Sequence, residues 1–466
     1  MSRELLDRII KAYDIRGLVD EEVTPDFTFA LGIAFAKFVE REREPATIVV
    51  GEDMRPSSPD LAGAFSDGIT SQGLDVIRIG LASTDQLYFA SGQLNLPGAM
   101  FTASHNPAEY NGIKLCKSGA RPIGQESGLL WIKDQILRGM TEGFPIPNRI
   151  TGKESSRDLL AEYVDFLFSL FPPGAFSGDF LERPIRIAID SGNGMGGHTA
   201  PAVMARINAV VDGIYFDLDG TFPNHEANPI EAKNLVDLQK LVREKKADIG
   251  LAFDGDADRC FLVDERGELV SPSALTALIA ERELKKSPGA PIIYNLICSR
   301  AVPEVINENG GIPLRSRVGH SYIKKMMAEN DAIFGGEHSG HFYFKDFWNA
   351  DSGMLAALHA IAALLEEKKS LSQLLERFNR YSLSGELNTK VADQKEAIAS
   401  IKKSFAQSPE PVDFDELDGL TVTSAKWSFN VRPSNTEPLL RLNVEGVTTD
   451  EMVRVQDLVL RLIRSG

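Results

Sequence analysis

The chain has 466 residues, of which 43% are hydrophobic and 25% are charged, the ordinary composition of a soluble globular protein. At roughly 100–200 residues per domain, this length predicts three or four domains. The formal net charge of -16 argues against a nucleic-acid-binding protein, because such proteins meet phosphates with lysine and arginine.

The cysteines and the N-terminus predict a cytoplasmic protein. Cys116, Cys260 and Cys298 are widely spaced and form no CxxC pair, which favours buried thiols in a reducing compartment. The charged N-terminus lacks the apolar stretch of a signal peptide, and no apolar run approaches the ~20 residues of a membrane span. We therefore expect no membrane attachment.

In the first third of the chain, apolar helical patterns alternate with β-branched strands. Thr24 and Pro25 open a helix that we expect to reach about Glu44, with Thr24 as N-cap and Pro25 as first helical residue. The other elements predicted here are strands at 47–50 and 74–79 and helices at 58–71 and 84–94. This alternation predicts an α/β fold with parallel or mixed sheets.

The stretch Phe101-Thr102-Ala103-Ser104-His105-Asn106-Pro107 carries the first candidate for chemistry. Its Asn-Pro pair favours a turn, so we expect Ser104 at the exposed tip of a strand-to-loop junction. A hydroxyl there can act as a nucleophile or carry a phosphoryl group, and an ordinary polar turn is the competing interpretation. Lys114 is either a cation or proton carrier over the same loop, or a solvated lysine on an edge strand.

Residues 141–157 are polar and turn-rich, and we interpret them as a linker before a helix at about 158–170. A strand at 186–190 then runs into the glycine-rich segment 191–197. Such a turn can cradle a phosphate. It lacks the Gly-Lys-Ser/Thr ending of a P-loop, so tight packing of strand against helix is the favoured interpretation.

Three aspartates follow an apolar strand at alternate positions, in Asp254-Gly255-Asp256-Ala257-Asp258-Arg259. Their carboxylates converge only if the loop curls around a cation, and oxygen-only ligands suit Mg²⁺ or Mn²⁺ rather than zinc. The spacing also matches an EF-hand, but Arg259 stands where that loop requires glycine, and the flanks read as strands. A basic group beside the aspartates suggests an anion bound next to the metal.

The last third of the chain continues the α/β pattern, with a strand at 291–297 and helices at 301–309 and 351–378. His320, in a glycine turn before an amphipathic helix, reads either as a capping residue or as a proton carrier. Over the final ~90 residues, charged helices flank short strands. Residues 430–438 combine a guanidinium, hydroxyls, an amide and turn N–H groups, which suits a bound phosphate.

The glycine-flanked loop 335–341 offers Glu337 and Ser339 as acceptors and donors for sugar hydroxyls. Metal binding is the alternative interpretation, because His338 and His341 lie three residues apart. A matching second pair of zinc ligands is missing nearby, so the zinc interpretation is weak.

Four stretches, in chain order, resemble the motifs of the α-D-phosphohexomutase superfamily: residues 102–107, 254–259, 336–341 and 432–438. The resemblance begins at residues 13–17 and covers nearly the whole chain. Within the superfamily the sequence looks most like the bacterial phosphomannomutase/phosphoglucomutase group, since His338 stands where phosphoglucosamine mutases usually carry Gln.

The resemblance implies three similar α/β domains with mixed sheets and a smaller C-terminal α+β domain, around a central active-site cleft. It places these domains at residues 1–150 with the catalytic serine loop, 151–262 with the metal-binding loop, 263–372 with the sugar-binding loop and 373–466 with the phosphate-binding loop.

The resemblance also implies roles at the reacting end. Ser104 is the expected phosphoserine, and one Mg²⁺ is expected between a phosphoserine oxygen and Asp254, Asp256 and Asp258. Near them we expect the basic side chains of Arg16, Lys114, Arg259 and His320. The competing interpretation of Arg16 is a surface arginine. Lys114 and His320 are the candidate proton carriers. We expect the His105 side chain to point away from Ser104, and to serve the catalytic site as a loop organiser or phosphate contact.

The remaining implied residues bind substrate. Those expected at the sugar, besides Arg259, are Tyr13, Glu337, Ser339 and His341, with Glu337 and Ser339 on the O3 and O4 hydroxyls. Those expected at the phosphate that does not react are Arg432, Ser434, Asn435 and Thr436. One departure is Ile297, which stands where some members carry a lysine, so one possible ligand contact is in doubt.

The implied reaction is a reversible phosphoryl transfer between hexose 1-phosphate and hexose 6-phosphate, with mannose, glucose or both as the sugar. Hexose 1,6-bisphosphate is its intermediate and activator. Phosphoglucosamine mutase is the alternative, and a catalytically silent sugar-phosphate sensor is a third, although a pure binder needs neither nucleophile nor metal. No GxSxG elbow surrounds Ser104, which argues against a serine hydrolase. We expect a monomer or a weak dimer.

Overall fold

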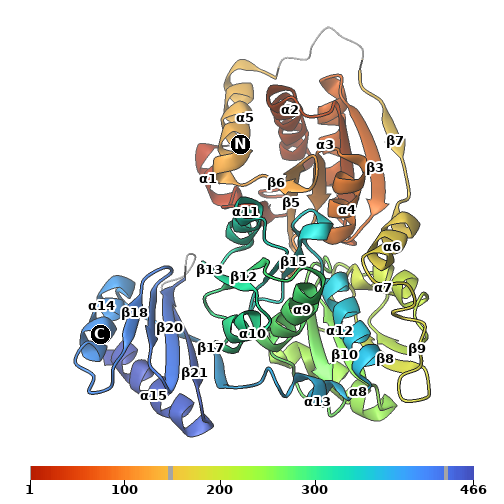
Figure 1. The fold of residues 1–466 in the computed structure, drawn as a ribbon. Helices are drawn as coiled ribbons and strands as arrows, with labels where there is room; N and C mark the ends of the chain where they lie inside the picture. The colour runs from red at the N-terminus through yellow and green to blue at the C-terminus, as the bar shows by residue number, and fades with distance from the viewer. Residues whose placement is uncertain (1, 145–150, 435–438, 466) are drawn as a thin grey trace. The chain divides into compact units, whose positions relative to one another are not determined.

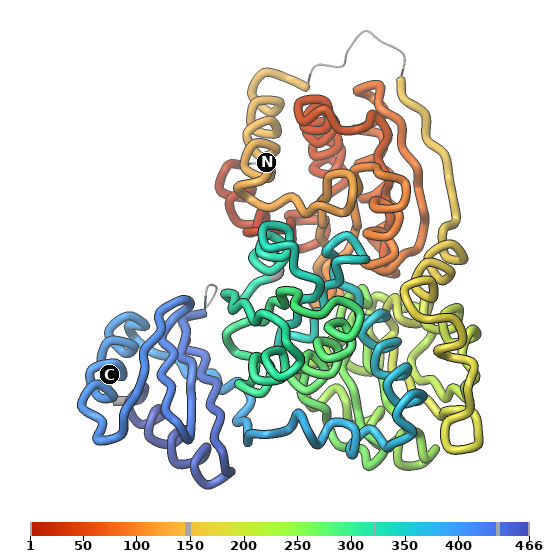
Figure 2. Tube along the Cα trace, viewed as in Figure 1, coloured from red at the N-terminus to blue at the C-terminus, as the bar shows by residue number. Residues whose placement is uncertain are grey.

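The computed structural model describes residues 2–144, 151–434 and 439–465. The chain folds into two compact units, which are described separately here. Unit 1 comprises Met1–Val270 and Ser339–Leu374, and unit 2 comprises Ser271–His338 and Leu375–Gly466. Figures 1 and 2 follow the chain by colour through both units.

Unit 1 begins with a mixed β-sheet, seven-stranded in the described residues. Its strands are β1 (Ile15–Leu18), β2 (Thr47–Glu52), β3 (Asp75–Leu81), β4 (Gly98–Phe101), β5 (Tyr110–Lys117), β6 (Arg121–Pro122) and β7 (Glu154–Ser156). The order is β1-β5-β4-β2-β3-β7, with β6 beside β5. β4, β2, β3 and β7 are parallel, whereas β5 runs antiparallel to β1 and β4.

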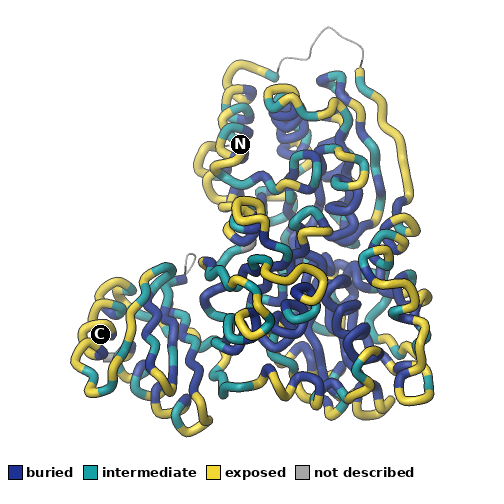
Figure 3. Tube along the Cα trace, viewed as in Figure 1, coloured by how far each residue is buried: buried dark blue, intermediate teal, exposed yellow. Residues whose placement is uncertain are grey.

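Helices accompany this sheet: α1 (Arg3–Ile9), α2 (Pro25–Glu42), α3 (Ser58–Ser71), α4 (Thr84–Leu94) and α5 (Leu130–Glu142), with a short π-turn at Gln125–Leu129. The predicted start of α2 is confirmed, since the Thr24 side chain accepts a hydrogen bond from the Phe27 N–H and Pro25 is the first helical residue. Apolar residues of α1, α2, α3, α5 and strands β1 to β5 form one buried core, and buried residues are dark blue in Figure 3.

The prediction that residues 141–157 are only a linker is wrong for its last part. Residues 145–150 lie outside the described residues, but β7 pairs in parallel with β3. The side chains of β7 are all exposed. The sequence pattern missed this strand because it reads side chains, whereas an edge strand needs only backbone N–H and C=O groups.

The second sheet of unit 1 consists of β8 (Ile185–Asp190), β9 (Ala209–Ile214), β10 (Ile249–Phe253) and β11 (Cys260–Asp264), in the order β11-β10-β8-β9. Its accompanying helices are α6 (Leu160–Ser169), α7 (Gly196–Met204) and α8 (Val236–Lys245), with a 3-10 turn at Ala232–Leu235. The glycine-rich segment after β8 packs closely against the loop between β10 and β11. A Cβ on Gly194 would lie 2.6 Å from the carbonyl oxygen of Gly255.

The returning segment of unit 1 contains the antiparallel pair β15 (Phe342–Phe344) and β16 (Ala350–Asp351), joined by a 3-10 turn at Lys345–Phe347. α12 (Gly353–Glu367) then packs against β10 and β11, as Figure 1 shows, and α13 (Leu371–Leu375) follows. The predicted single helix at 351–378 is therefore wrong. Lys368 adopts a left-handed conformation, with φ of 55°, which ends α12.

Unit 2 first contains three parallel strands, β12 (Pro291–Asn295), β13 (Ile312–Ser316) and β14 (Phe334–Gly336), with α9 (Pro272–Lys286), α10 (Ala301–Glu308) and α11 (His320–Asn330). An antiparallel sheet follows: β17 (Ser382–Lys390), β18 (Asp413–Asp415), β19 (Leu420–Thr423), β20 (Trp427–Pro433) and β21 (Leu439–Gly446). α14 (Gln394–Phe405) and α15 (Thr449–Ser465) pack on this sheet around a separate core.

The predicted fold class is confirmed: α/β segments with parallel and antiparallel strands precede a smaller α+β segment. The central cleft stays a prediction, because it would involve both units. Cys116 and Cys260 are buried free thiols as expected, whereas Cys298 is only half-buried. In the part of the chain that the structure describes, no helix combines the length and the apolarity needed to cross a bilayer.

Helices α2 and α3 approach each other through two glycines, which gives a first testable prediction. A Cβ on Gly32 would lie 2.2 Å from the Phe65 carbonyl oxygen, and the position faces Gly68. We expect Gly32→Ala to lower the free energy of unfolding by about 1–3 kcal/mol through overpacking, measured by denaturant unfolding. The matched control is Gly63→Ala on α3, where the nearest atom lies 4.0 Å away; it should be neutral or stabilising, and equal losses would refute the packing argument.

Candidate active site

Ser104 lies in the loop between β4 and β5, so the predicted strand-to-loop junction is confirmed. Its φ of 51° is left-handed, and its N–H donates to Thr102 Oγ1 at 2.9 Å. The expectation that Ser104 is exposed is wrong, since only 3% of the residue is accessible. The metal-loop residue Gly255 covers it, because a Cβ there would lie 2.3 Å from the Ser104 carbonyl oxygen.

The Ser104 hydroxyl contacts two groups of different chemistry. Its Oγ donates to Asp254 Oδ2 at 2.8 Å, and it lies 3.2 Å from His105 Nδ1. The expectation that the His105 side chain points away from Ser104 is therefore wrong. Burial lowers the pKa of His105 well below its usual range, and the charges of Arg259 and Arg16 act in the same direction.

The three aspartates of the loop between β10 and β11 converge as predicted. Asp254, Asp256 and Asp258 are 0–1% exposed, and one carboxylate oxygen from each lies within 4.8 Å of the others. Their flanks are two antiparallel strands rather than helices, which agrees with the rejection of an EF-hand.

Cations and hydroxyls neutralise this acidic cluster. Lys114 Nζ lies 2.7 Å from Asp256 Oδ2 and 2.6 Å from Asp258 Oδ2. Thr84 Oγ1 donates to Asp256 Oδ2 at 2.6 Å. Burial opposes ionisation of Asp256, but the Lys114 ammonium outweighs it and holds the pKa of Asp256 below its usual range. Lys114 is therefore not a solvated lysine on an edge strand. It lies within β5, and its side chain is largely buried.

Arg259 pairs with the first aspartate. Its Nε donates to Asp254 Oδ2 at 2.9 Å, and its backbone N–H donates to Asp254 Oδ1 at 3.1 Å. Burial raises the pKa of Asp254 to about 7, against the opposing charge of Arg259. Nη2 of Arg259 is buried and has no hydrogen-bond partner among the described residues, so it could donate to an anion, and the bound anion stays a prediction.

The acidic cluster has the chemistry of a metal site. Oδ1 of Asp256 and Oδ1 of Asp258 are buried without a hydrogen-bond partner in the described residues. Unpaired buried carboxylate oxygens are unfavourable unless a cation satisfies them. The residues present therefore fit a hard metal ion that prefers oxygen ligands.

Arg16 of β1 contacts the serine loop. Arg16 Nε donates to Asp14 Oδ2 at 2.7 Å, and its Nη1 donates to Asn106 Oδ1 at 2.6 Å. Tyr13 precedes β1 and is half-buried. Arg16 is therefore not the solvated surface arginine of the competing interpretation.

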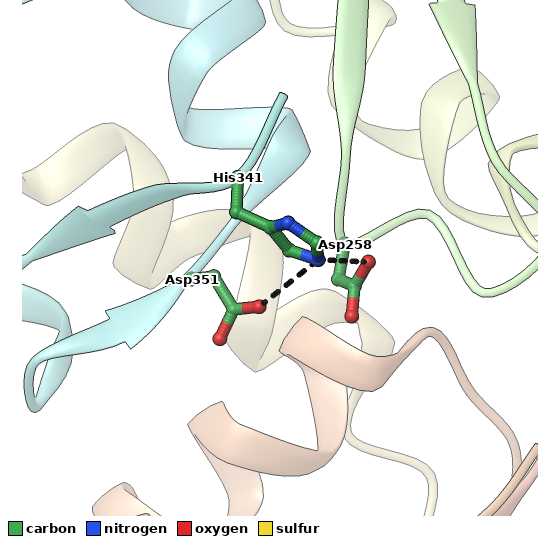
Figure 4. Close-up of side chains that lie close together, drawn as sticks. All are labelled: Asp258, His341 and Asp351. Carbon is green, nitrogen blue, oxygen red and sulfur yellow. Dashed lines mark ion pairs between the residues drawn. The ribbon is translucent and has the colours of Figure 1, made fainter. Parts of the chain in front are cut away.

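His341 lies beside the acidic cluster, on the segment before β15. Its Nε2 is 3.6 Å from Asp258 Oδ1 and 4.0 Å from Asp351 Oδ2, as Figure 4 shows. Its Nδ1 lies 3.0 Å from Ser339 Oγ. The zinc interpretation paired His341 with His338, but the groups near His341 that could ligate a metal are these two aspartates.

The other predicted residues belong to unit 2 and are described within it. Glu337, just after β14, is 2% exposed and accepts from Asn295 Nδ2 at 3.4 Å. His320 is the first residue of α11, and its side chain lies outside the described part. Ile297, in place of the lysine of some members, lines a cavity of about 200 Å³ together with Arg300.

The predicted phosphate site is described only in part. Asn435 and Thr436 lie outside the described residues, and the Ser434 N–H donates to the Leu439 carbonyl at 2.9 Å. Arg432 and its cross-strand neighbour Arg441 both donate to the Glu386 carboxylate at 3.0 Å. Sequence reasoning missed Glu386, which lies about 50 residues earlier in the chain and has no motif around it.

Comparison with known proteins agrees with this arrangement. Family models described as Phosphoglucomutase/phosphomannomutase match in four parts: alpha/beta/alpha domain I at residues 7–142, domain II at 161–267, domain III at 271–381 and the C-terminal domain at 386–462. The chain belongs to the phosphoglucomutase/phosphomannomutase family.

Individual relatives extend this family assignment. The chain is 39% identical over 442 residues to a phosphomannomutase of Escherichia coli K12, covering 93% of this chain and 94% of that protein. It is 36% identical over 468 residues to one of Methanocaldococcus jannaschii, covering 97% and 98%. A crystal structure of a phosphoglucomutase/phosphomannomutase family protein from Burkholderia thailandensis matches with a TM-score of 0.86 and 29% identity, covering 100% and 98%. As a member of this family, the chain is a phosphohexomutase enzyme.

The sequence motifs did not indicate a further buried carboxylate near this site, that of Asp85. Asp85, next to Thr84 on α4, accepts from Ser83 Oγ, from Tyr163 Oη at 2.7 Å and from Ser352 Oγ at 2.6 Å. It thus joins α4, α6 and the start of α12. Sequence reasoning missed it because its partners lie 78 and 267 positions away.

Asp85 gives a prediction for the pH dependence of stability. Burial raises its pKa from 3.8 to about 6 in the folded protein, so the folded state binds more protons between these values. The free energy of unfolding should therefore fall by about 3 kcal/mol as the pH rises from about 4 to about 6. We expect this contribution to be absent in Asp85→Asn, measured by urea unfolding at several pH values. The exposed Asp67→Asn is the control, and parallel pH profiles of Asp85→Asn and wild type would contradict the prediction.

Lys114 gives a prediction for metal-free protein. Lys114→Met leaves Asp256 and Asp258 without their cation, so we expect a loss of about 3–5 kcal/mol in the free energy of unfolding with a chelator present. Added Mg²⁺ should restore more stability to this variant than to wild type. Lys117→Met on the same strand removes a partly exposed pair with Glu42 and should cost at most about 1 kcal/mol. Equal losses in the two variants would show that Lys114 does not balance the aspartates.

Proposed function

We propose that the protein reversibly moves a phosphoryl group between the 1- and 6-positions of hexose phosphates, with mannose and glucose phosphates as substrates. The observation that carries this proposal is the hydrogen bond from Ser104 Oγ to Asp254, the first of three buried carboxylates. A nucleophile at the rim of a metal-type cluster suits phosphoryl transfer, where positioning and charge neutralisation dominate. The relatives named phosphomannomutase support the choice of sugar.

The reaction in this proposal starts with the phosphoryl group on Ser104 Oγ. The free hydroxyl of a hexose monophosphate attacks phosphorus, and its O–P bond forms as the Oγ–P bond breaks. The hydroxyl proton passes through a proton carrier to Ser104 Oγ, and hexose 1,6-bisphosphate results. The bisphosphate turns over, and its other phosphoryl group returns to Ser104 Oγ by the reverse exchange of bonds. Oxygens of Asp254, Asp256 and Asp258, with one phosphoryl oxygen, would hold one Mg²⁺, which when bound neutralises charge on the transferring group.

The basic residues divide into charge carriers and proton carriers. The carboxylates of Asp256 and Asp258 outweigh burial and hold the pKa of Lys114 well above its usual range, so we assign Lys114 as a cation at the site. His105 Nδ1 lies 3.2 Å from Ser104 Oγ, so we assign His105 as a loop organiser or phosphate contact. Arg16 and Arg259 would pair with phosphoryl oxygens. His320 stays a candidate proton carrier from the sequence.

Substrate binding completes the proposal. Glu337 and Ser339 would read sugar hydroxyls, with Tyr13 and His341 beside them. Arg432, Ser434, Asn435 and Thr436 would hold the phosphate that does not react. Because Glu386 already pairs with Arg432, a bound phosphate would share or displace that carboxylate.

The proposal also includes the domain ranges, the location and the oligomeric state that the sequence predicts. The domain ranges are 1–150, 151–262, 263–372 and 373–466, each with its own functional loop. A cytoplasmic location and a monomeric or weakly dimeric state are likewise proposed from the sequence.

The test is conversion of mannose, glucose and glucosamine 1-phosphates to their 6-phosphates, with Mg²⁺ and a trace of glucose 1,6-bisphosphate. We expect turnover of the first two sugars, and a loss of roughly 10⁴-fold or more in Ser104→Ala. Ser177→Ala, at an exposed serine in a loop, is the control that should keep full activity. A preference for glucosamine would identify a phosphoglucosamine mutase, and no turnover by phosphorylated protein would favour a sugar-phosphate sensor.

A further inference from the structure

Arg55 is a buried arginine that none of the roles above uses. It follows β2 and is 1% exposed, with its guanidinium carbon 5.1 Å from the centre of the Phe222 ring. Gly220 covers it, because a Cβ there would lie 2.6 Å from the Arg55 Cα. A buried cation is costly unless its donors are satisfied, so its hydrogen bonds indicate what it does.

All four N–H groups on the terminal nitrogens of Arg55 donate to one loop, the segment that carries Ser104. Nη1 donates to the carbonyl oxygens of Pro107 and Tyr110, both at 2.8 Å. Nη2 donates to the carbonyl oxygens of Ser104 at 2.9 Å and Asn106 at 2.7 Å. One planar guanidinium therefore fixes four carbonyls between residues 104 and 110.

The guanidinium is itself anchored to the sheet. Arg55 Nε lies 3.3 Å from Asp53 Oδ2, and Asp53 Oδ1 accepts from the Arg55 N–H at 3.0 Å and from Ser58 Oγ at 2.6 Å. Asp53 and Ser58 lie at the end of β2 and the start of α3. The loop is thus tied through Arg55 to two regular elements.

This arrangement sets the orientation of the backbone at the reactive serine. A trans peptide unit is planar, so the carbonyl of Ser104 that points at Arg55 turns the N–H of His105 away from it. The left-handed φ of Ser104 costs free energy that surrounding contacts must supply. Without Arg55, four carbonyls would lose their donor, and the loop would relax.

We propose that Arg55 is a positioning residue for phosphoryl transfer, which holds the Ser104 loop so that Oγ stays beside Asp254. This inference rests on the proposed function of Ser104 as phosphoryl carrier. A lysine cannot replace it, because an ammonium offers three donors from one atom rather than a planar fork. Arg55 touches neither the hydroxyl of Ser104 nor the acidic cluster in any hydrogen bond of the described residues.

The test compares Arg55→Lys with Arg78→Lys. Arg78 lies on β3 of the same sheet, is half-buried and pairs with Glu52 instead of the loop. We expect kcat of Arg55→Lys to fall by roughly 10²-fold, because a small misplacement of a nucleophile is costly. The KM for hexose phosphate should change by less than about threefold, because the residues proposed to bind the sugar and its phosphate are untouched. Arg78→Lys should keep kcat within about threefold.

A second readout does not depend on turnover. Hydrogen–deuterium exchange of residues 102–111 should accelerate in Arg55→Lys and stay unchanged in Arg78→Lys. Unchanged exchange, or a kcat of Arg55→Lys within about threefold of wild type, would overturn the inference. If wild type itself turns over no sugar phosphate, the proposed function fails, whereas the exchange result still decides whether Arg55 orders the loop.

Asp53→Asn keeps the test decisive if Arg55→Lys fails to fold. This variant retains the guanidinium but weakens its anchor, so we expect a smaller loss of kcat, roughly 10-fold, with KM unchanged. Faster exchange in residues 102–111 should accompany it. Full kcat and wild-type exchange in folded Asp53→Asn would contradict the inference.

Discussion

Three carboxylates are buried in one short loop of unit 1, and the rest of the site depends on compensating that negative charge. Moving a carboxylate out of water costs several kcal/mol unless cations and donors replace the water. Lys114 from β5 and Arg259 from the loop itself supply cations, and Thr84 from α4 supplies a hydroxyl. The elements that pack around the acidic loop therefore contribute cationic or hydroxyl groups to it.

The reactive serine is placed through its backbone more than through its side chain. Its carbonyl accepts a hydrogen bond from Arg55, and its N–H donates to Thr102. Because Gly255 has no side chain, the metal loop can approach the Ser104 carbonyl closely. At Gly255 the backbones of two loops from different sheets come into close contact. This leaves the hydroxyl next to Asp254, where a phosphoryl group would meet cations without rearrangement of the loop.

The predicted site residues around Ser104 and those in the antiparallel sheet of unit 2 make different kinds of contacts. Around Ser104, buried groups pair across loops and helices. In the antiparallel sheet of unit 2, Arg432 and Arg441 share one carboxylate, Glu386. A phosphate at the proposed site would compete with Glu386 for the two guanidinium groups.

Short-range patterns in the sequence were sufficient for features that depend on neighbouring residues. The alternate spacing of Asp254, Asp256 and Asp258 after a strand, the cap at Thr24 and the rejection of the EF-hand needed no knowledge of the fold. The burial of Ser104 and the roles of Arg55 and Asp85 depended on contacts between residues tens to hundreds of positions apart. Such contacts arise from packing and charge compensation in the folded chain, and nothing in a local stretch of sequence records them.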